Sequence, residues 1–160
     1  FDPILSDWAQ EKGDSIKFIQ TPAISSEYWR LLGRNFLTYQ ELGEHDRYHT
    51  AFFRAIHDGG RTFTDQESLS AFYEQLGGEK QAYINAFNSV GVASELSKAD
   101  SMARRLKVAM VPSVVVQGKY LVRTSGSVGP KRMLDVMDYL LAKELAEREN
   151  NEARTSTLKN

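Results

Sequence analysis

The middle of the chain carries apolar residues at intervals of three and four positions, the spacing of one face of an α-helix. This spacing predicts helices over residues 26–42 and 45–57, another after residue 64, a short one near residues 83–87 and a longer one over residues 92–106. Glycine pairs at positions 59–60 and 77–78 separate these segments. The chain is therefore expected to be helical from about residue 25 to residue 107.

Two polar signals indicate where helices begin. Asp2 and Pro3 offer an N-cap acceptor followed by a proline at the first helical position, so a helix is expected there, ending at Gly13. Thr64 and Glu67 have the spacing of a capping box and predict the start of a further helix.

The two ends of the chain have a different pattern. Residues 16–19 alternate enough to predict a short strand, and residues 108–122 predict a loop, a proline, a strand, a turn at Gly118 and a second strand. A last helix is expected from Pro130, with a frayed polar tail beyond residue 149. This order of elements predicts an α/β domain that is interrupted by a helical insertion.

The composition of the chain excludes several kinds of function. The 20 basic and 21 acidic residues leave a net charge of −1, without the basic excess typical of a nucleic-acid-binding protein. No apolar run approaches the roughly 20 residues of a membrane span. The chain contains no cysteine, which excludes disulfide and thiolate chemistry within these residues. It begins with Phe1 rather than methionine, and we expect a processed or partial chain.

His45 and His49 lie one helical turn apart, the spacing of a zinc-binding H-E-x-x-H helix. A hydrolytic zinc site also needs a longer carboxylate than Asp46 and a third ligand. We therefore interpret the pair as two exposed histidines in the first turn of an ordinary helix, and no metal site is predicted. A zinc hydrolase stays as a third hypothesis.

Four short segments, taken in their order along the chain, carry a resemblance. They are residues 1–5 (Phe-Asp-Pro-Ile-Leu), residues 86–89 (Ala-Phe-Asn-Ser), the pair Val111 and Pro112, and residues 118–120 (Gly-Lys-Tyr). Together they resemble the DsbA family of thiol:disulfide oxidoreductases over nearly the whole chain apart from the tail.

The resemblance implies a thioredoxin-like fold interrupted by a helical insertion. It places the thioredoxin-like part in residues 1–24 and 96–149, the insertion domain in residues 25–95 and a polar tail in residues 150–160. In the family a Cys-x-x-Cys motif and two strands precede the position of Phe1, so the N-terminal strands and the central strand are expected to be absent from this chain. That central strand would lie between residues 16–19 and residues 113–116.

The resemblance also implies a function, disulfide formation in secreted proteins of the periplasm. The redox cysteines are expected upstream of Phe1, no catalytic residue is expected in this chain, and these residues alone should be redox-inactive. Reduced or unfolded secreted proteins and a membrane quinone-linked re-oxidising partner are the expected partners, with no cofactor and no nucleic acid.

A substrate-binding loop is expected at Met110, Val111 and Pro112, where the resemblance implies a cis peptide bond before the proline. A trans proline that merely begins a strand is the alternative interpretation of Pro112. For the whole chain, the alternative is a non-catalytic thioredoxin-fold module that binds peptides and has no redox cysteines.

Overall fold

The computed structural model describes residues 2–126 and 128–157 of the chain. The chain divides into two compact units, one formed by Phe1–Ile19 with Leu106–Asn160 and the other by Gln20–Arg105. Each unit has its own apolar core.

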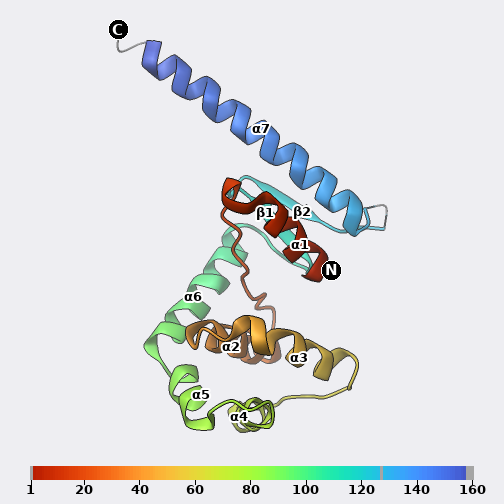
Figure 1. The fold of residues 1–160 in the computed structure, drawn as a ribbon, viewed down its shortest axis with the longest axis vertical. Helices are drawn as coiled ribbons and strands as arrows, with labels where there is room; N and C mark the ends of the chain where they lie inside the picture. The colour runs from red at the N-terminus through yellow and green to blue at the C-terminus, as the bar shows by residue number, and fades with distance from the viewer. Residues whose placement is uncertain (1, 127, 158–160) are drawn as a thin grey trace. The chain divides into compact units, whose positions relative to one another are not determined.

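The unit of residues 20–105 is helical (Figure 1). Its elements are α2 (Glu27–Glu41), α3 (His45–His57), α4 (Gln66–Gln75), α5 (Lys80–Phe87) and α6 (Val90–Arg105). Helix α2 packs against α3, α5 and α6, and α4 packs against α5. Aromatic side chains dominate the core that α2, α3, α4 and α5 share; its buried members are Tyr39, Tyr48, Phe52, Phe63, Leu69, Phe72, Tyr73, Tyr83 and Phe87.

Helix starts in this unit follow from local side-chain chemistry. The Ser26 hydroxyl accepts a hydrogen bond from the backbone N–H of Trp29 at 3.2 Å and caps α2. Helix α4 has a capping box, but it joins Asp65 to Ser68 rather than Thr64 to Glu67, so the predicted residues were wrong by one position. The bonds are reciprocal: the N–H of Ser68 donates to Asp65 Oδ1, and the Ser68 hydroxyl accepts from the N–H of Asp65.

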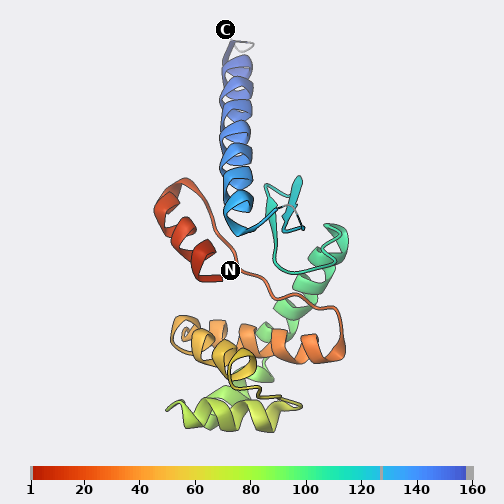
Figure 2. The same ribbon diagram turned by 90° about the vertical axis from the view of Figure 1, so that its right-hand side faces the viewer.

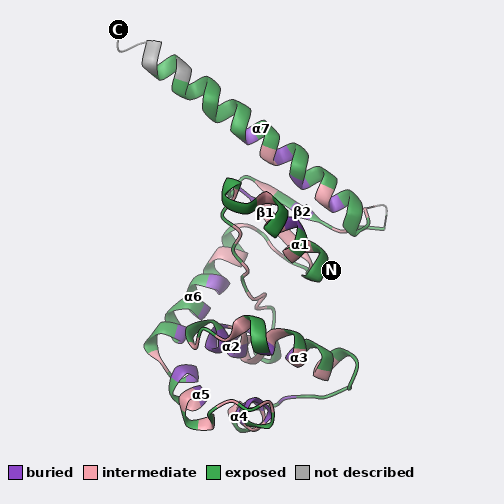
Figure 3. Ribbon diagram, in the orientation of Figure 1, coloured by how far each residue is buried: buried purple, intermediate pink, exposed green. Residues whose placement is uncertain are grey.

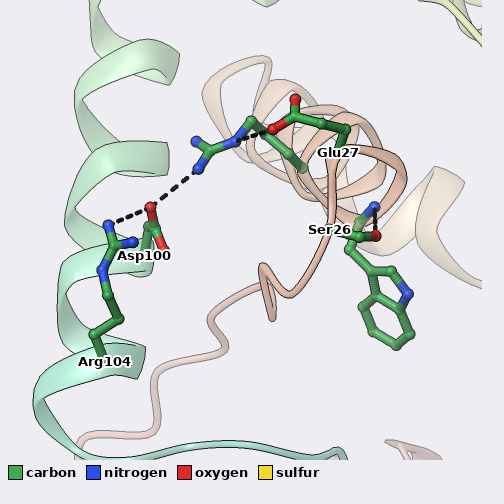
Figure 4. Close-up of polar contacts among 6 residues, drawn as sticks. Ser26, Glu27, Asp100 and Arg104 are labelled. Atoms are coloured by element: carbon green, nitrogen blue, oxygen red, sulfur yellow. Dashed lines mark hydrogen bonds and ion pairs between the residues drawn. The ribbon is translucent and has the colours of Figure 1, made fainter.

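A buried carboxylate joins α2 to α6. Asp100 Oδ2 lies 3.0 Å from a guanidinium nitrogen of Arg30 and 2.6 Å from one of Arg104 (Figure 4). Arg104 lies one turn after Asp100 on α6, so the carboxylate pairs both within its own helix and with α2.

The other unit holds α1 (Asp2–Lys12), a short 3-10 turn at Gly13–Ser15, the strands β1 (Ser113–Val116) and β2 (Tyr120–Arg123), and α7 (Pro130–Thr157). The strands pair antiparallel, with Val114 opposite Val122. Gln117 and Gly118 have φ values of 52° and 68°, which gives the hairpin the left-handed turn that suits the twist of its strands.

Helix α1 and the hairpin lie to either side of the first turns of α7 (Figure 2). Their shared core is formed by Trp8, Val116, Val122, Met133, Met137 and Leu140. The buried positions of α7 run from Met133 to Glu144, and the helix beyond them is largely exposed (Figure 3).

Two sequence-based expectations are corrected here. Residues 16–19, predicted to form a strand, are not part of a ladder, because a strand requires a partner and β1 pairs only with β2 among the residues that the structure describes. The segment from residue 150, expected to fray, continues α7 to Thr157, with support from the ion pair of Arg148 and Glu152 at i,i+4.

Along residues 2–126 and 128–157, no helix combines the length and apolar character that crossing a bilayer requires.

Candidate functional site

The loop just before β1 contains the three residues that the sequence singled out for substrate binding. The Val111–Pro112 peptide bond is cis. The side chains of Met110 and Val111 are half exposed, at 50% and 51%. The Ser113 hydroxyl donates a hydrogen bond to the Met110 carbonyl at 2.6 Å, which fixes the loop to the first residue of the strand. Ser113 had not been singled out, since a serine next to a proline has no distinctive sequence signal.

The free edge of β1 borders a groove within the same unit. The groove has a volume of about 1270 Å³ and runs between residues 15–18 and Val114–Gln117. Trp8, Met137 and Leu141 contribute apolar surface to it. Alternate residues of an edge strand direct their N–H and C=O groups away from the paired neighbour, so this edge offers backbone hydrogen bonds to an extended segment.

Two ion pairs lie along this groove. Lys119 Nζ is 2.6 Å from Glu144 Oε2, and this hydrogen bond holds the pKa of Glu144 below its ordinary value against the opposing effect of burial. Lys12 Nζ is 2.7 Å from Asp138 Oδ1, which also accepts a hydrogen bond from the Trp8 indole. Both pairs join α7 to other elements of the unit.

Helix α1 begins at Asp2, as the sequence predicts, and the partial positive charge of a helix N-terminus favours an anion such as a thiolate. Phe1 and the side chain of Asp2 lie outside the described part of the structure. The chain has no cysteine, so the described residues supply a helix start and an exposed cis-proline loop, but no thiolate.

The histidine pair of α3 is arranged differently from the expectation. The rings of His45 and His49 lie 4.4 Å apart between centroids, and both side chains are partly buried rather than fully exposed. No cluster of three potential ligands, counted over the described residues, surrounds them.

One unit contains a two-stranded hairpin that is preceded by a cis-proline loop. Along the chain, the helices α2 to α6 separate α1 from this hairpin, and α7 follows it. These features define a class, a thioredoxin-like domain with a helical insertion. Within that class, residues 4–140 match the family model described as the DSBA-like thioredoxin domain. The chain belongs to this DsbA-like family.

Individual relatives agree. The chain is 33% identical to the thiol:disulfide interchange protein DsbA of Azotobacter vinelandii over 144 residues, which cover 90% of this chain and 67% of the relative. It is 32% identical to the protein of the same name from Pseudomonas aeruginosa, over 91% of this chain and 69% of the relative.

Solved structures give the same result. The crystal structure of Pseudomonas aeruginosa DsbA superposes with a TM-score of 0.87 at 31% identity and covers 92% of this chain and 77% of that one. The oxidoreductase DsbA of Xylella fastidiosa gives a TM-score of 0.81 at 28% identity, over 91% of this chain and 78% of that one. A Proteus DsbA variant, solved with a non-covalently bound peptide, shares the fold at a TM-score of 0.63. The predicted family and the α/β fold class with its helical insertion are thereby confirmed.

Proposed function

We propose that this chain is the substrate-holding part of a DsbA-like thiol:disulfide interchange protein that introduces disulfides into secreted proteins of the periplasm. The observation that carries the proposal is the family match across residues 4–140, which includes the loop of Met110, Val111 and Pro112. Residues 1–24 and 96–149 would form the thioredoxin-like domain and residues 25–95 the insertion domain.

Disulfide formation requires a thiolate that attacks a disulfide sulfur and a second thiol that resolves the mixed disulfide. These 160 residues contain no cysteine, so the redox pair of such a protein must lie outside them. The contribution of this chain is then to bind the substrate polypeptide. The exposed side chains of Met110 and Val111 offer apolar contact, and the backbone of the loop offers hydrogen bonds to an extended peptide.

Reduced or unfolded secreted proteins are the substrates that fit such a loop. They present extended backbone together with apolar side chains, which a folded protein hides. Re-oxidation by a membrane quinone-linked partner follows from the family resemblance and is part of the same proposal.

A second candidate function is a peptide-binding module without redox activity. The absence of cysteine from all 160 residues favours it. Counting thiols in the natural protein after reduction, by reaction with a chromogenic disulfide, separates the two. A redox-active pair supports the oxidant, whereas no thiol contradicts it and leaves the binding module.

Peptide binding is tested separately with the Met110→Lys variant. A charge on the loop should weaken the binding of an extended apolar peptide by about tenfold, because burying an unpaired ammonium is unfavourable. Val90→Lys is the matched control, since Val90 is 86% exposed and lies on α6. Equal peptide affinity in the two variants would place the binding surface elsewhere.

A further inference from the structure

One face of α3 carries a row of rings spaced four residues apart. His45, His49, Phe53 and His57 follow one another along this face, with ring centroids 4.4, 4.6 and 5.5 Å apart from each to the next. Side chains four positions apart on a helix are neighbours, so each ring contacts the following one. The first two members are the only adjacent pair in the row that are both potential metal ligands.

The two imidazoles are held in place by a neighbouring helix. Phe36 of α2 meets His45 edge-on at 4.7 Å and His49 edge-on at 5.7 Å. Both histidines are partly buried by this packing. A ring that is packed on one side loses part of its rotamer freedom before any ligand arrives, so less entropy is lost when a ligand binds.

We propose that His45 and His49 form a chelating site for one divalent first-row transition ion, with Cu²⁺ bound most tightly and Zn²⁺ less so. Neutral imidazole is a good ligand for both ions, and the Irving–Williams order sets their ranking. Each histidine contributes one ring nitrogen. The described residues bring no third protein ligand to the pair, so water completes the coordination sphere and the site is open rather than a closed structural zinc site.

Glu44 and Asp46 precede and follow His45 in the sequence, so negative charge lies near the proposed site. That charge offsets the positive end of the helix dipole, which by itself disfavours a cation. The Glu44 side chain does not cap α3; its carboxylate instead accepts a hydrogen bond from the Tyr73 hydroxyl and pairs with Arg47. An ion that joins residues 45 and 49 would bridge this uncapped first turn and stabilise the helix.

The test titrates CuCl₂ and ZnCl₂, separately, into the natural protein in its oxidised form. Oxidation ensures that no thiol outside these 160 residues competes for the metal. Calorimetry should give one equivalent of Cu²⁺ bound, and either His45→Ala or His49→Ala should weaken that binding by at least about tenfold. His57→Ala is the matched control, because it removes the remaining histidine of the chain and leaves the pair intact. Its affinity should equal that of the wild type.

Two further measurements distinguish binding at His45 and His49 from non-specific binding. One equivalent of Zn²⁺ should shift the imidazole NMR signals of His45 and His49 but not those of His57, and should raise the melting temperature of the wild type but not of His49→Ala. The proposal is overturned if the wild type binds no Cu²⁺, if the His45 and His49 variants bind as tightly as the wild type, or if His57→Ala abolishes binding. The result does not depend on the thiol count, so it stands or falls separately from the disulfide function.

Discussion

Trp8 donates a hydrogen bond from its indole Nε1 to Asp138 Oδ1 at 3.0 Å, across 130 positions of sequence. Lys12 reaches the same oxygen at 2.7 Å. One carboxylate of α7 therefore holds two residues of α1 at the edge of the core, and Trp8 itself is buried to 7% exposure. Burial disfavours the charged carboxylate, but the hydrogen bonds from Lys12 and Trp8 outweigh it and hold the pKa of Asp138 below its ordinary 3.8.

Asp138→Asn should reduce the free energy of unfolding by about 1 kcal/mol at neutral pH, the value of a partly exposed polar contact. A carboxyl group whose folded pKa is lowered stabilises the protein above its unfolded pKa, and that stabilisation is lost as the pH falls through the lower, folded pKa. The difference between wild type and variant should therefore shrink at pH values below 3.8. Urea unfolding across this range measures it.

Asp135→Asn is the control for this experiment, because Asp135 is an exposed aspartate on the same helix. It should leave neutral stability within about 0.5 kcal/mol of the wild type. A difference for Asp138→Asn that stays constant down to strongly acid pH would show that the carboxylate charge has no part in the contact.

Asp100→Asn should destabilise the helical unit by about 1.5 kcal/mol, because a largely buried carboxylate loses its charge against two arginines. Arg104→Gln should cost only about 0.5 kcal/mol, since the Arg104 side chain is 73% exposed and water replaces its contact. Chemical denaturation of both variants gives the comparison. Glu95→Gln removes the exposed pair with Lys98 and should cost no more than Arg104→Gln. An equal loss for all three would mean that burial does not set the strength of the Asp100 contact.

The sequence predicted helices best where each helix carries its own signal. Helix α3 begins and ends at the predicted residues 45 and 57, because its apolar spacing and the following glycines are local. Residues 16–19 have strand-like alternation, but a ladder depends on a partner strand that no local pattern supplies. The far part of α7 was missed because its polar composition resembles a tail, and pairs such as Arg148 with Glu152 form only once the helix exists.

The residues of the candidate site also fall into two groups, those with a signal in the sequence and those without one. Val111 and Pro112 were found through the family resemblance, since their signal is a short motif at a fixed place in the chain. The contact between Lys119 and Glu144 joins residues 25 positions apart, and neither residue is unusual in its own segment. Contacts of this kind depend on the packing of α7 against the hairpin, which sequence periodicity does not specify.

Gly78→Ala should cost about 2 kcal/mol, because an added Cβ would lie 2.2 Å from a ring carbon of Tyr73, inside the aromatic core. The N–H of Gly78 also donates to the Tyr73 carbonyl at 3.0 Å, so the backbone is not free to move away. Thermal unfolding measures the effect. Gly91→Ala provides the contrast: its Cβ would come too close only to the flexible end of Glu41 and would meet Ser89 Oγ at an ordinary 3.5 Å, so stability should stay within about 0.5 kcal/mol or rise. A neutral Gly78→Ala would show that the Tyr73 ring can shift.

Alkaline pH should unfold the helical unit through its buried phenols. Burial raises the pKa of Tyr39, Tyr73 and Tyr83 well above the ordinary 10.0, with Glu44 adding to the effect at Tyr73. A raised folded pKa means that stability is complete below pH 10.0 and declines above it, by about 1.4 kcal/mol per pH unit for each such tyrosine. The buried phenols should therefore ionise together with unfolding, in one cooperative step of phenolate absorbance.

Tyr83→Phe separates the two contributions of that residue. The Tyr83 hydroxyl donates to Asn35 Oδ1 at 2.7 Å, so its removal leaves a buried acceptor without its donor and should cost about 1–2 kcal/mol at neutral pH. Above pH 10.0 the variant should lose stability less steeply than the wild type, because one buried phenol no longer ionises on unfolding. Tyr139→Phe, at a 67% exposed position, should leave neutral stability unchanged. Parallel slopes for wild type and Tyr83→Phe would contradict the assignment, because they would mean that the Tyr83 phenol ionises equally in the folded and unfolded chains.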